Sequence, residues 1–157
     1  CSPDCLGFVD EGPNINITAT TTGLTGEYIT AAALLGLGWR VSMSQQDSVD
    51  LVAWSGQDFM RVQVKSAQIH KQRDRAIGYQ FQNASGRGKK TLPTLEQFDV
   101  LAHCAINDRK VHFTAACSVN QYTQRRPPSW FHQDDLEQRS WEKAVQIVME
   151  TRNGQTN

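Results

Sequence analysis

Residues 49–65 read VDLVAWSGQDFMRVQVK, and this stretch decides the fold. It places Asp50 at the start of an apolar run, which is typical of a central strand. A turn-forming SGQD segment follows. Polar and apolar residues then alternate over residues 59–67, which places Gln63 and Lys65 on one face of a second strand. A hairpin of the two strands therefore brings an acid and a lysine together.

The hairpin gains a second acid from a helix expected just upstream, where Glu27 falls in the first turn. Hydrolysis of a phosphodiester needs a cation that holds the phosphate and activates water. Asp50 is the natural anchor for Mg²⁺, because hard cations take oxygen ligands. Gln63 offers a neutral side-chain oxygen, and the backbone carbonyl of Val64 is a further ligand. Lys65 can orient the attacking water, lower its pKa or neutralise developing charge.

Each of these residues has a structural explanation when it is taken alone. An acid that opens a strand or a lysine that closes one is commonly solvated or part of a surface ion pair. The dipole of the helix accounts for Glu27. Their joint arrangement favours a site, because Asp50 opens an otherwise apolar strand while Gln63 and Lys65 share a face of its hairpin partner.

Three segments resemble, in order and context, the motif of the PD-(D/E)XK nuclease superfamily: Gly26-Glu27, Asp50 and RVQVKS at 61–66. That superfamily includes type II restriction enzymes and archaeal Holliday-junction resolvases. The Gln-x-Lys form of the motif is similar to the branch that contains cyanobacterial group I intron homing endonucleases. A later FDVLA strand and an SWE segment in the closing helix also resemble that branch. The resemblance covers roughly residues 23–150.

This resemblance implies a role for each residue of the motif. Asp50 corresponds to the metal-binding acid, Lys65 to the catalytic lysine and Glu27 to the helical acid. Gln63 stands where the superfamily usually has an acid, and the missing negative charge should weaken metal binding. The intron-nuclease branch tolerates this change, so Gln63 is interpreted as a mark of the branch. Val49 stands in place of the leading proline of the family motif.

The periodicities beyond the hairpin predict one α/β domain. Its expected fold is a restriction-endonuclease-like core, a central mixed β-sheet flanked by helices. Residues 1–22 are expected to form an N-terminal extended arm, residues 23–152 a single nuclease domain and residues 153–157 a C-terminal tail. The expected elements are a helix over 26–37, strands at 39–43, 50–54, 59–67, 79–81, 98–106 and 110–117, and a closing helix over 133–152.

Several finer expectations accompany this outline. Thr22 or Thr25 is expected to cap the first helix. Its buried stripe is expected to consist of Tyr28, Ala31, Ala32 and Leu35. Two polar segments are expected to be connections without strands, at 70–75 and 124–129.

Composition places few limits on function. The chain has 157 residues, 39% of them apolar, which suits one domain with its own core. Lys+Arg and Asp+Glu balance at 16 each, so any DNA-binding charge must be local. The candidate phosphate contacts are the glycine-flanked loop with Arg87, Lys89 and Lys90, with further candidates at Lys71, Arg73, Arg75, Arg125 and Arg126. Glutamines at 68, 72, 80 and 82 can read adenine edges, but none of them stands out in a glutamine-rich chain.

The four cysteines do not form a convincing zinc motif. Cys1 and Cys5 share a polar start, whereas Cys104 and Cys117 lie in predicted strands. A set of His103, Cys104, His112 and Cys117 can be imagined, but neighbours on a strand point to opposite faces. Free thiols are therefore expected. No apolar run is long enough to span a membrane, and the chain is expected to be a cytoplasmic protein of a bacterium or a phage.

The sequence thus predicts a metal-dependent DNA endonuclease that hydrolyses phosphodiester bonds with a metal-activated water. Mg²⁺ is the expected cofactor, with Mn²⁺ as a substitute. DNA is the expected partner, and a homodimer or homotetramer is expected because cutting two strands needs two sites. Two alternatives remain open: a Holliday-junction-resolvase-like nuclease, and a non-catalytic DNA-binding module with a decayed site.

Overall fold

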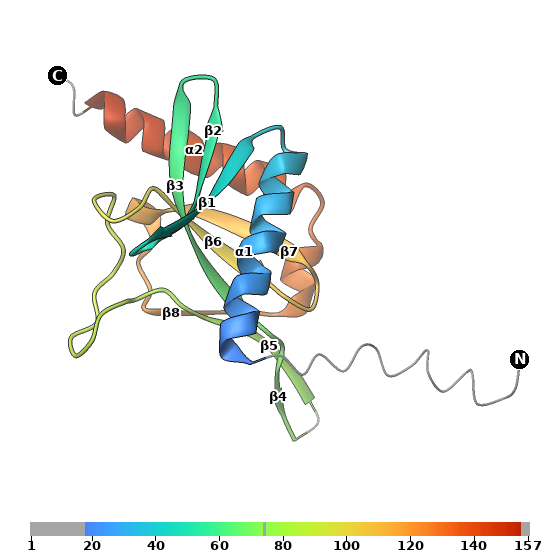
Figure 1. Ribbon diagram of the computed structural model, residues 1–157. Helices are drawn as coiled ribbons and strands as arrows, with labels where there is room; N and C mark the ends of the chain where they lie inside the picture. The colour runs from blue at the N-terminus through green and yellow to red at the C-terminus, as the bar shows by residue number, and fades with distance from the viewer. Residues whose placement is uncertain (1–17, 74, 155–157) are drawn as a thin grey trace, which may run out of the picture.

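The computed structural model describes residues 18–73 and 75–154 (Figure 1). Its elements in chain order are α1 (Ala19–Gly36), β1 (Arg40–Gln46), β2 (Val49–Ser55), β3 (Asp58–Ala67), β4 (His70–Gln72), β5 (Arg75–Gln82), β6 (Val100–Ala105), β7 (Lys110–Ala115), η2 (Ala116–Ser118), β8 (Thr123–Arg126), η3 (Pro128–His132) and α2 (Leu136–Gly154).

The centre of the fold is a five-stranded mixed sheet with the order β1-β2-β3-β6-β7. All neighbouring strands in it are antiparallel except β3 and β6, which are parallel. A smaller antiparallel sheet has the order β4-β5-β8. In Figure 1, the β4–β5 end of this small sheet extends away from the body of the molecule, below α1. The expected restriction-endonuclease-like architecture is confirmed.

Of the three hydrophobic core clusters among the described residues, two join these layers. The larger one joins both helices to alternate residues of the central strands, such as Leu51 on β2 and Val62 on β3. The second lies between the two sheets, where Tyr79 and Phe81 of β5 pack against Ala67 of β3. Residues of even number on β3, such as Val62, therefore face the large core, whereas Ala67 at the end of β3 faces the small sheet.

Helix α1 starts earlier and is rotated relative to the expectation. Thr18 caps it, and its hydroxyl accepts a hydrogen bond from the Thr21 N–H. Residues 19–22, assigned to the arm, are therefore helical, and the remainder of the arm, 1–17, lies outside the described residues. The predicted stripe was wrong except at Ala31, because Tyr28 and Leu35 are exposed. The buried positions are Gly26, Thr30, Ala31 and Leu34.

The two segments expected to be connections contain strands. Residues 70–72 form β4, which pairs with β5, and residues 123–126 form β8, which pairs with the other edge of β5. Neither strand has apolar alternation of its own, so pairing with β5 and not hydrophobic patterning determines them. The closing helix was predicted correctly apart from its ends, because α2 starts at Leu136, directly after Asp135 with φ 55°.

Helix α2 also shields the outer edge of the large sheet. The β7 N–H groups of Val111 and Phe113 donate to Glu137 and Ser140 of α2. Unpaired strand edges invite association with other chains, and these side chains occupy two of the donors that β7 exposes.

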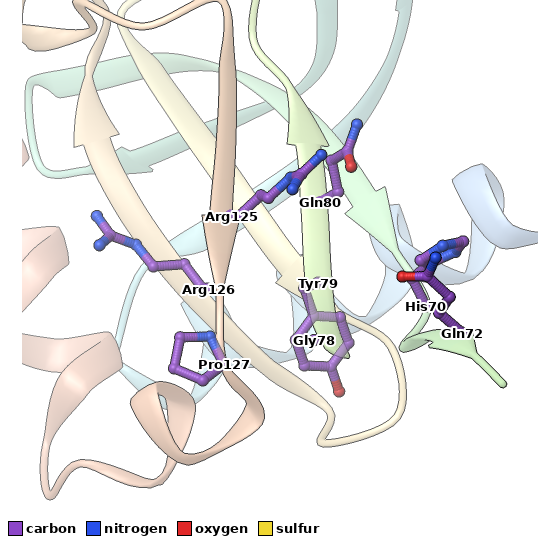
Figure 2. Close-up of a pocket in the computed structure, with 8 residues that line it drawn as sticks. All are labelled: His70, Gln72, Gly78, Tyr79, Gln80, Arg125, Arg126 and Pro127. Atoms are coloured by element: carbon purple, nitrogen blue, oxygen red, sulfur yellow. The ribbon is translucent and has the colours of Figure 1, made fainter. Parts of the chain in front are cut away.

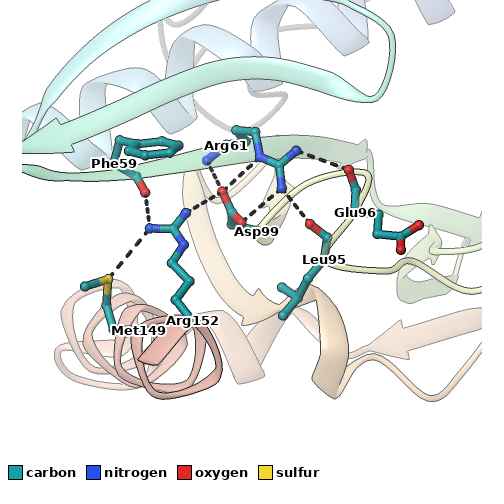
Figure 3. Close-up of polar contacts among 7 residues, drawn as sticks. All are labelled: Phe59, Arg61, Leu95, Glu96, Asp99, Met149 and Arg152. Carbon is teal, nitrogen blue, oxygen red and sulfur yellow. Dashed lines mark hydrogen bonds and ion pairs between the residues drawn. The ribbon is translucent and has the colours of Figure 1, made fainter. Parts of the chain in front are cut away.

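A buried carboxylate ties α2 to the start of β3 (Figure 3). Asp99 accepts the Arg61 N–H at 2.8 Å and pairs with the guanidinium groups of Arg61 at 3.1 Å and Arg152 at 3.0 Å. Arg61 also donates to the carbonyls of Leu95 and Glu96. This clamp holds the 95–99 loop against β3, two residues before the motif at 63–65.

Two further expectations concern membranes and cysteines. Among the residues described here, no helix is long and apolar enough to cross a membrane. Cys104 is a buried free thiol and Cys117 an exposed one. Cys1 and Cys5 lie outside the described residues. Within the described ranges no three His, Cys, Asp or Glu side chains come together as a metal site.

Candidate active site

The site is built where β2 and β3 part. Their paired register runs up to Leu51 opposite Val62. One step further, the Asp50 carboxylate, through Oδ2, accepts the N–H of Val64 at 2.7 Å. The Asp50 side chain thus takes the position of the β2 backbone carbonyl that would otherwise accept from Val64. The other edge of β3 stays paired with β6.

This contact places oxygen atoms of Asp50 and Val64 on the same side of β3. The N–H and C=O of a paired strand residue point to the same neighbour, so the Val64 carbonyl faces the Asp50 side of β3 together with its N–H. The Asp50 carboxylate is engaged by that N–H through Oδ2. Asp50 itself is only partly buried.

Helix α1 brings the second acid, Glu27, to Asp50. A Cβ on Gly26 would lie 1.7 Å from the Ser66 hydroxyl oxygen, so only glycine lets α1 approach β3 this closely. Glu27, the next residue, then reaches Asp50. Burial raises the pKa of Glu27 to about 7, and the hydrogen bond and the charge repulsion from Asp50 add to the shift. Two carboxylates held this way need a shared proton or a cation between them.

Lys65 lies within electrostatic reach of Asp50. Burial lowers the pKa of Lys65, the Asp50 carboxylate opposes that shift, and the Lys90 ammonium adds to it. Lys65 is paired in register with His103 of β6, whose ring bonds Asn83 at 2.6 Å and stacks on Phe81. Lys65 therefore lies beside a buried His103 whose ring is held by Asn83 and Phe81.

Gln63 is the member of the motif that stays apart. Its backbone pairs with Leu101. Within residues 18–73 and 75–154 its half-buried side chain makes no hydrogen bond or ion pair. Its amide is therefore available to a ligand but is not oriented by a neighbour.

The predicted DNA contacts fall into two places. Arg87, Lys89 and Lys90 are exposed on a loop closed by the bridge between Ser85 and Thr91, and of these Lys90 acts on Lys65. Lys71 and Arg73 are exposed on the β4–β5 hairpin, outside the cluster around Asp50.

Two features of the site had not been expected. The first is Gly26, which sets the approach of α1; a small residue directly before the helical acid was the only signal for it. The second is an open hollow of about 420 Å³ beside Lys65, between the start of α1 and the end of β3. There the Gln68 side chain donates to the Thr22 hydroxyl at 3.2 Å.

Comparison with known proteins identifies the class. The family model of the PD-(D/E)XK endonucleases matches residues 17–121, about two thirds of the chain. The chain therefore belongs to the PD-(D/E)XK endonuclease family. Among solved structures, it is similar to the bacterial homing endonuclease I-Ssp6803I, with a TM-score of 0.63 and 16% identity over 90% of this chain and 99% of that one. At this identity the likeness shows the fold. Comparison with curated proteins finds no match.

Family membership supports nuclease activity, and PD-(D/E)XK nucleases generally use divalent metal ions. The donors present here fit such an ion. Asp50 and Glu27 supply adjacent carboxylates, and Val64 supplies a carbonyl on the same side. All are hard oxygen ligands of the kind that Mg²⁺ prefers.

Proposed function

We propose that this protein is a Mg²⁺-dependent DNA endonuclease, with Mn²⁺ able to replace Mg²⁺. The observation that carries the proposal is the position of Asp50, which bonds Val64 where two strands part, with Glu27 and Lys65 within electrostatic reach. An acid pair beside a partly desolvated lysine is the charge pattern that phosphodiester hydrolysis requires.

Asp50 and the Val64 carbonyl would hold the cation, with Glu27 and the Gln63 amide oxygen completing the donor set. When bound, the cation supplies charge that stabilises the phosphate in the transition state and activates water. The residues of the chain do the positioning. Val64 orients the Asp50 carboxylate through its N–H, and Gly26 brings Glu27 to it.

Lys65 provides the positive charge at its Nζ that neutralises the attacked phosphate. Its half-buried position makes this charge effective, because Coulomb interactions strengthen as water is excluded. Lys90 adds a second cation from the basic loop, so phosphate is favoured here. Arg87 and Lys89 on that loop, and Lys71 and Arg73 on the hairpin, are proposed to contact the DNA backbone.

We further propose that the active unit is a homodimer or homotetramer. The protein would act in the cytoplasm of a bacterial cell, and its gene would belong either to the bacterium or to a phage. Each chain has one Asp50–Lys65 site, and cutting both strands of a duplex in one complex needs two.

The test is a cleavage assay with wild type, Lys65→Ala and the surface control Lys143→Ala. The substrates are supercoiled plasmid, linear duplex and a synthetic four-way junction, each with Mg²⁺, Mn²⁺ or EDTA. We expect metal-dependent cutting that Lys65→Ala abolishes and Lys143→Ala retains. Retained cutting by Lys65→Ala would refute the assignment. A strong preference for the junction would redirect it to a resolvase-like nuclease.

Gln63 favours a second candidate, a non-catalytic DNA-binding module, because it removes an acid from the motif. The substitution Gln63→Glu separates the two. If the site has decayed, Gln63→Glu should create metal binding that wild type lacks, measured by calorimetry with Mn²⁺. If glutamine belongs to a working site, wild type binds Mn²⁺ and needs no such repair.

A further inference from the structure

The small sheet has an outer face that the core does not use. Tyr79 and Phe81 of β5 point inward and are buried, so Gln80 between them points outward. Gln80 is paired in register with Arg125 of β8. On the other side of β5, His70 pairs with Gly78, and Gln72, two residues further along β4, lies on the same face as His70.

These side chains surround a shallow hollow (Figure 2). It has a volume of about 260 Å³, and His70, Gln72, Gln80 and Arg125 all line it. In Figure 2, Arg125 and Gln80 lie close together on neighbouring strands, and His70 and Gln72 lie together on β4. We call this surface, with these four residues, the outer face.

The outer face carries hydrogen-bonding groups that the protein does not use. Across the part of the chain that the structure describes, none of its four side chains makes a hydrogen bond or ion pair. Other glutamines are engaged: Gln68 bonds Thr22, and Gln138 bonds Glu142.

Charge is also segregated onto this sheet. The chain as a whole is neutral, with 16 residues of each sign. By sequence, strands β4, β5 and β8 contain no acid, and they contain the cations Lys71, Arg75, Arg125 and Arg126. Arg126 packs over the Trp130 ring at 4.3 Å on the inner side, whereas Lys71, Arg75 and Arg125 are exposed. A neutral protein that gathers cations on one protruding sheet presents a local surface for a polyanion.

We propose that the outer face reads base edges in the major groove of duplex DNA next to the cleavage site. The inference rests on the proposed function and adds where and how the duplex is recognised. The protruding β4–β5 hairpin is a two-stranded ribbon of the kind that fits the major groove, where glutamine pairs with adenine and arginine with guanine. The exposed Lys71 and Arg75 would contact the flanking phosphates, which position but do not specify.

The chain connectivity limits the distance between the candidate active site at Lys65 and the outer face at His70. His70 follows Lys65 by five residues, which span at most about 17 Å when extended. One turn of DNA is about 34 Å for some 10 base pairs, so this reach is about half a turn. His70, the outer-face residue that is nearest to Lys65 along the chain, would therefore meet bases within about five base pairs of the scissile phosphate.

The test compares wild type with the triple variant Gln72→Ala/Gln80→Ala/Arg125→Ala. The matched control is Gln138→Ala/Gln146→Ala/Lys143→Ala, which removes the same kinds of group from exposed positions of α2. Full-length proteins select duplexes from a library with a randomised segment, in EDTA so that no strand is cut. Binding is then measured on the selected duplex and on a copy with glucosylated 5-hydroxymethylcytosine, which fills the major groove.

We expect wild type and the control to enrich a motif and to lose about tenfold or more in affinity on the glucosylated duplex. The triple variant should lose the enrichment and bind both duplexes equally. Unchanged enrichment in the triple variant, or no enrichment by wild type, would overturn the inference. The plasmid assay with Lys65→Ala tests the proposed function separately. If cutting is metal-dependent but either of these two overturning results is found, only the role of the outer face is rejected.

Discussion

At the scale of single residues, Asp50 combines two roles that a substitution can separate. One role needs only an acceptor oxygen, because Oδ2 satisfies the Val64 N–H at 2.7 Å. The other role, which belongs to the proposed function, needs a negative charge, because Asp50 would bind a cation. An amide keeps the first and loses the second, whereas alanine loses both.

We therefore expect both Asp50→Asn and Asp50→Ala to abolish cleavage but to differ in stability. Asp50→Asn keeps the bond to Val64 and should unfold close to wild type. Asp50→Ala leaves that N–H without its partner and should cost about 1–3 kcal/mol of unfolding free energy. Urea titration and the plasmid assay measure the two effects. Equal stability of the two variants would mean that the bond to Val64 contributes nothing.

Glu27 makes the stability of the metal-free protein depend on pH. Its pKa is raised from 4.5 to about 7 by burial and by Asp50, so the folded state holds this proton more tightly than the unfolded state does. Between these two values the folded state binds the proton and the unfolded state has released it. The contribution of protonated Glu27 to the free energy of unfolding is thus fully present below about pH 4.5 and is lost as pH rises through about 7.

We expect the melting temperature of wild type in EDTA to fall between about pH 5 and about pH 8 more steeply than that of Glu27→Gln. The variant has no proton to lose at this position, so the difference between the two curves isolates Glu27. Differential scanning fluorimetry across this pH range measures it. Mg²⁺ should reduce the fall in wild type, because a cation replaces the proton between the two carboxylates. Parallel curves would show that Glu27 does not titrate in this range.

At the scale of elements, the approach of α1 to β3 decides whether Glu27 reaches the site. A Cβ at Gly26 would overlap the Ser66 hydroxyl at 1.7 Å and approach the Ser66 Cβ at 2.8 Å, whereas Cys104 is at an ordinary 3.5 Å. The Ser66 hydroxyl is buried without a hydrogen-bond partner among the described residues, so nothing else holds it in place. Ser66 alone therefore causes the conflict.

We expect Gly26→Ala to reduce both stability and cleavage, because α1 must shift away from β3. Overpacking of this kind typically costs about 1–3 kcal/mol, more than alanine gains over glycine in a helix. Adding Ser66→Gly removes both conflicting atoms and should restore much of the cleavage. The double-mutant cycle in urea and in the plasmid assay measures this coupling. Additive effects would show that the two residues do not meet.

The same scale shows which elements could be predicted from the sequence. The β2–β3 hairpin was predictable because its register follows from a local turn and from alternation such as Met60 and Val62. Helix α1 was placed but wrongly rotated, because apolar residues surround it and periodicity cannot choose between Leu34 and Leu35. Strand β8 was missed because its pairing with β5 depends on residues some forty positions away.

The candidate site follows the same division. That Asp50 and Lys65 share a neighbourhood follows from the hairpin and could be predicted. That Glu27 joins them depends on tertiary packing at Gly26, which the hairpin does not determine; the expected upstream helix and the family resemblance suggested it. The sequence could not show that Gln72 and Gln80 of the outer face have side chains without a hydrogen bond, because composition alone does not show which glutamines are bonded. The roles assigned to the site residues remain predictions.

At the scale of the whole molecule, each chain contributes one acid pair and one Lys65, and a duplex has two strands to cut. If the active unit is a homodimer or homotetramer, a single assembly holds at least two sites that act on one DNA molecule. A chain with an inactive site can still occupy its place in the assembly. Mixed assemblies then cut one strand and leave the other intact.

We therefore expect wild type refolded with excess Lys65→Ala to convert supercoiled plasmid mainly into nicked circles, whereas wild type alone gives linear DNA. Linear product should fall more steeply than nicked product as the inactive fraction rises, because it requires two active subunits in one complex. Gel densitometry measures both products, and light scattering gives the mass of the assembly. If linear and nicked products fall in parallel and the mass is that of one chain, the protein acts as a monomer, and cutting of the second strand requires a second, independent encounter.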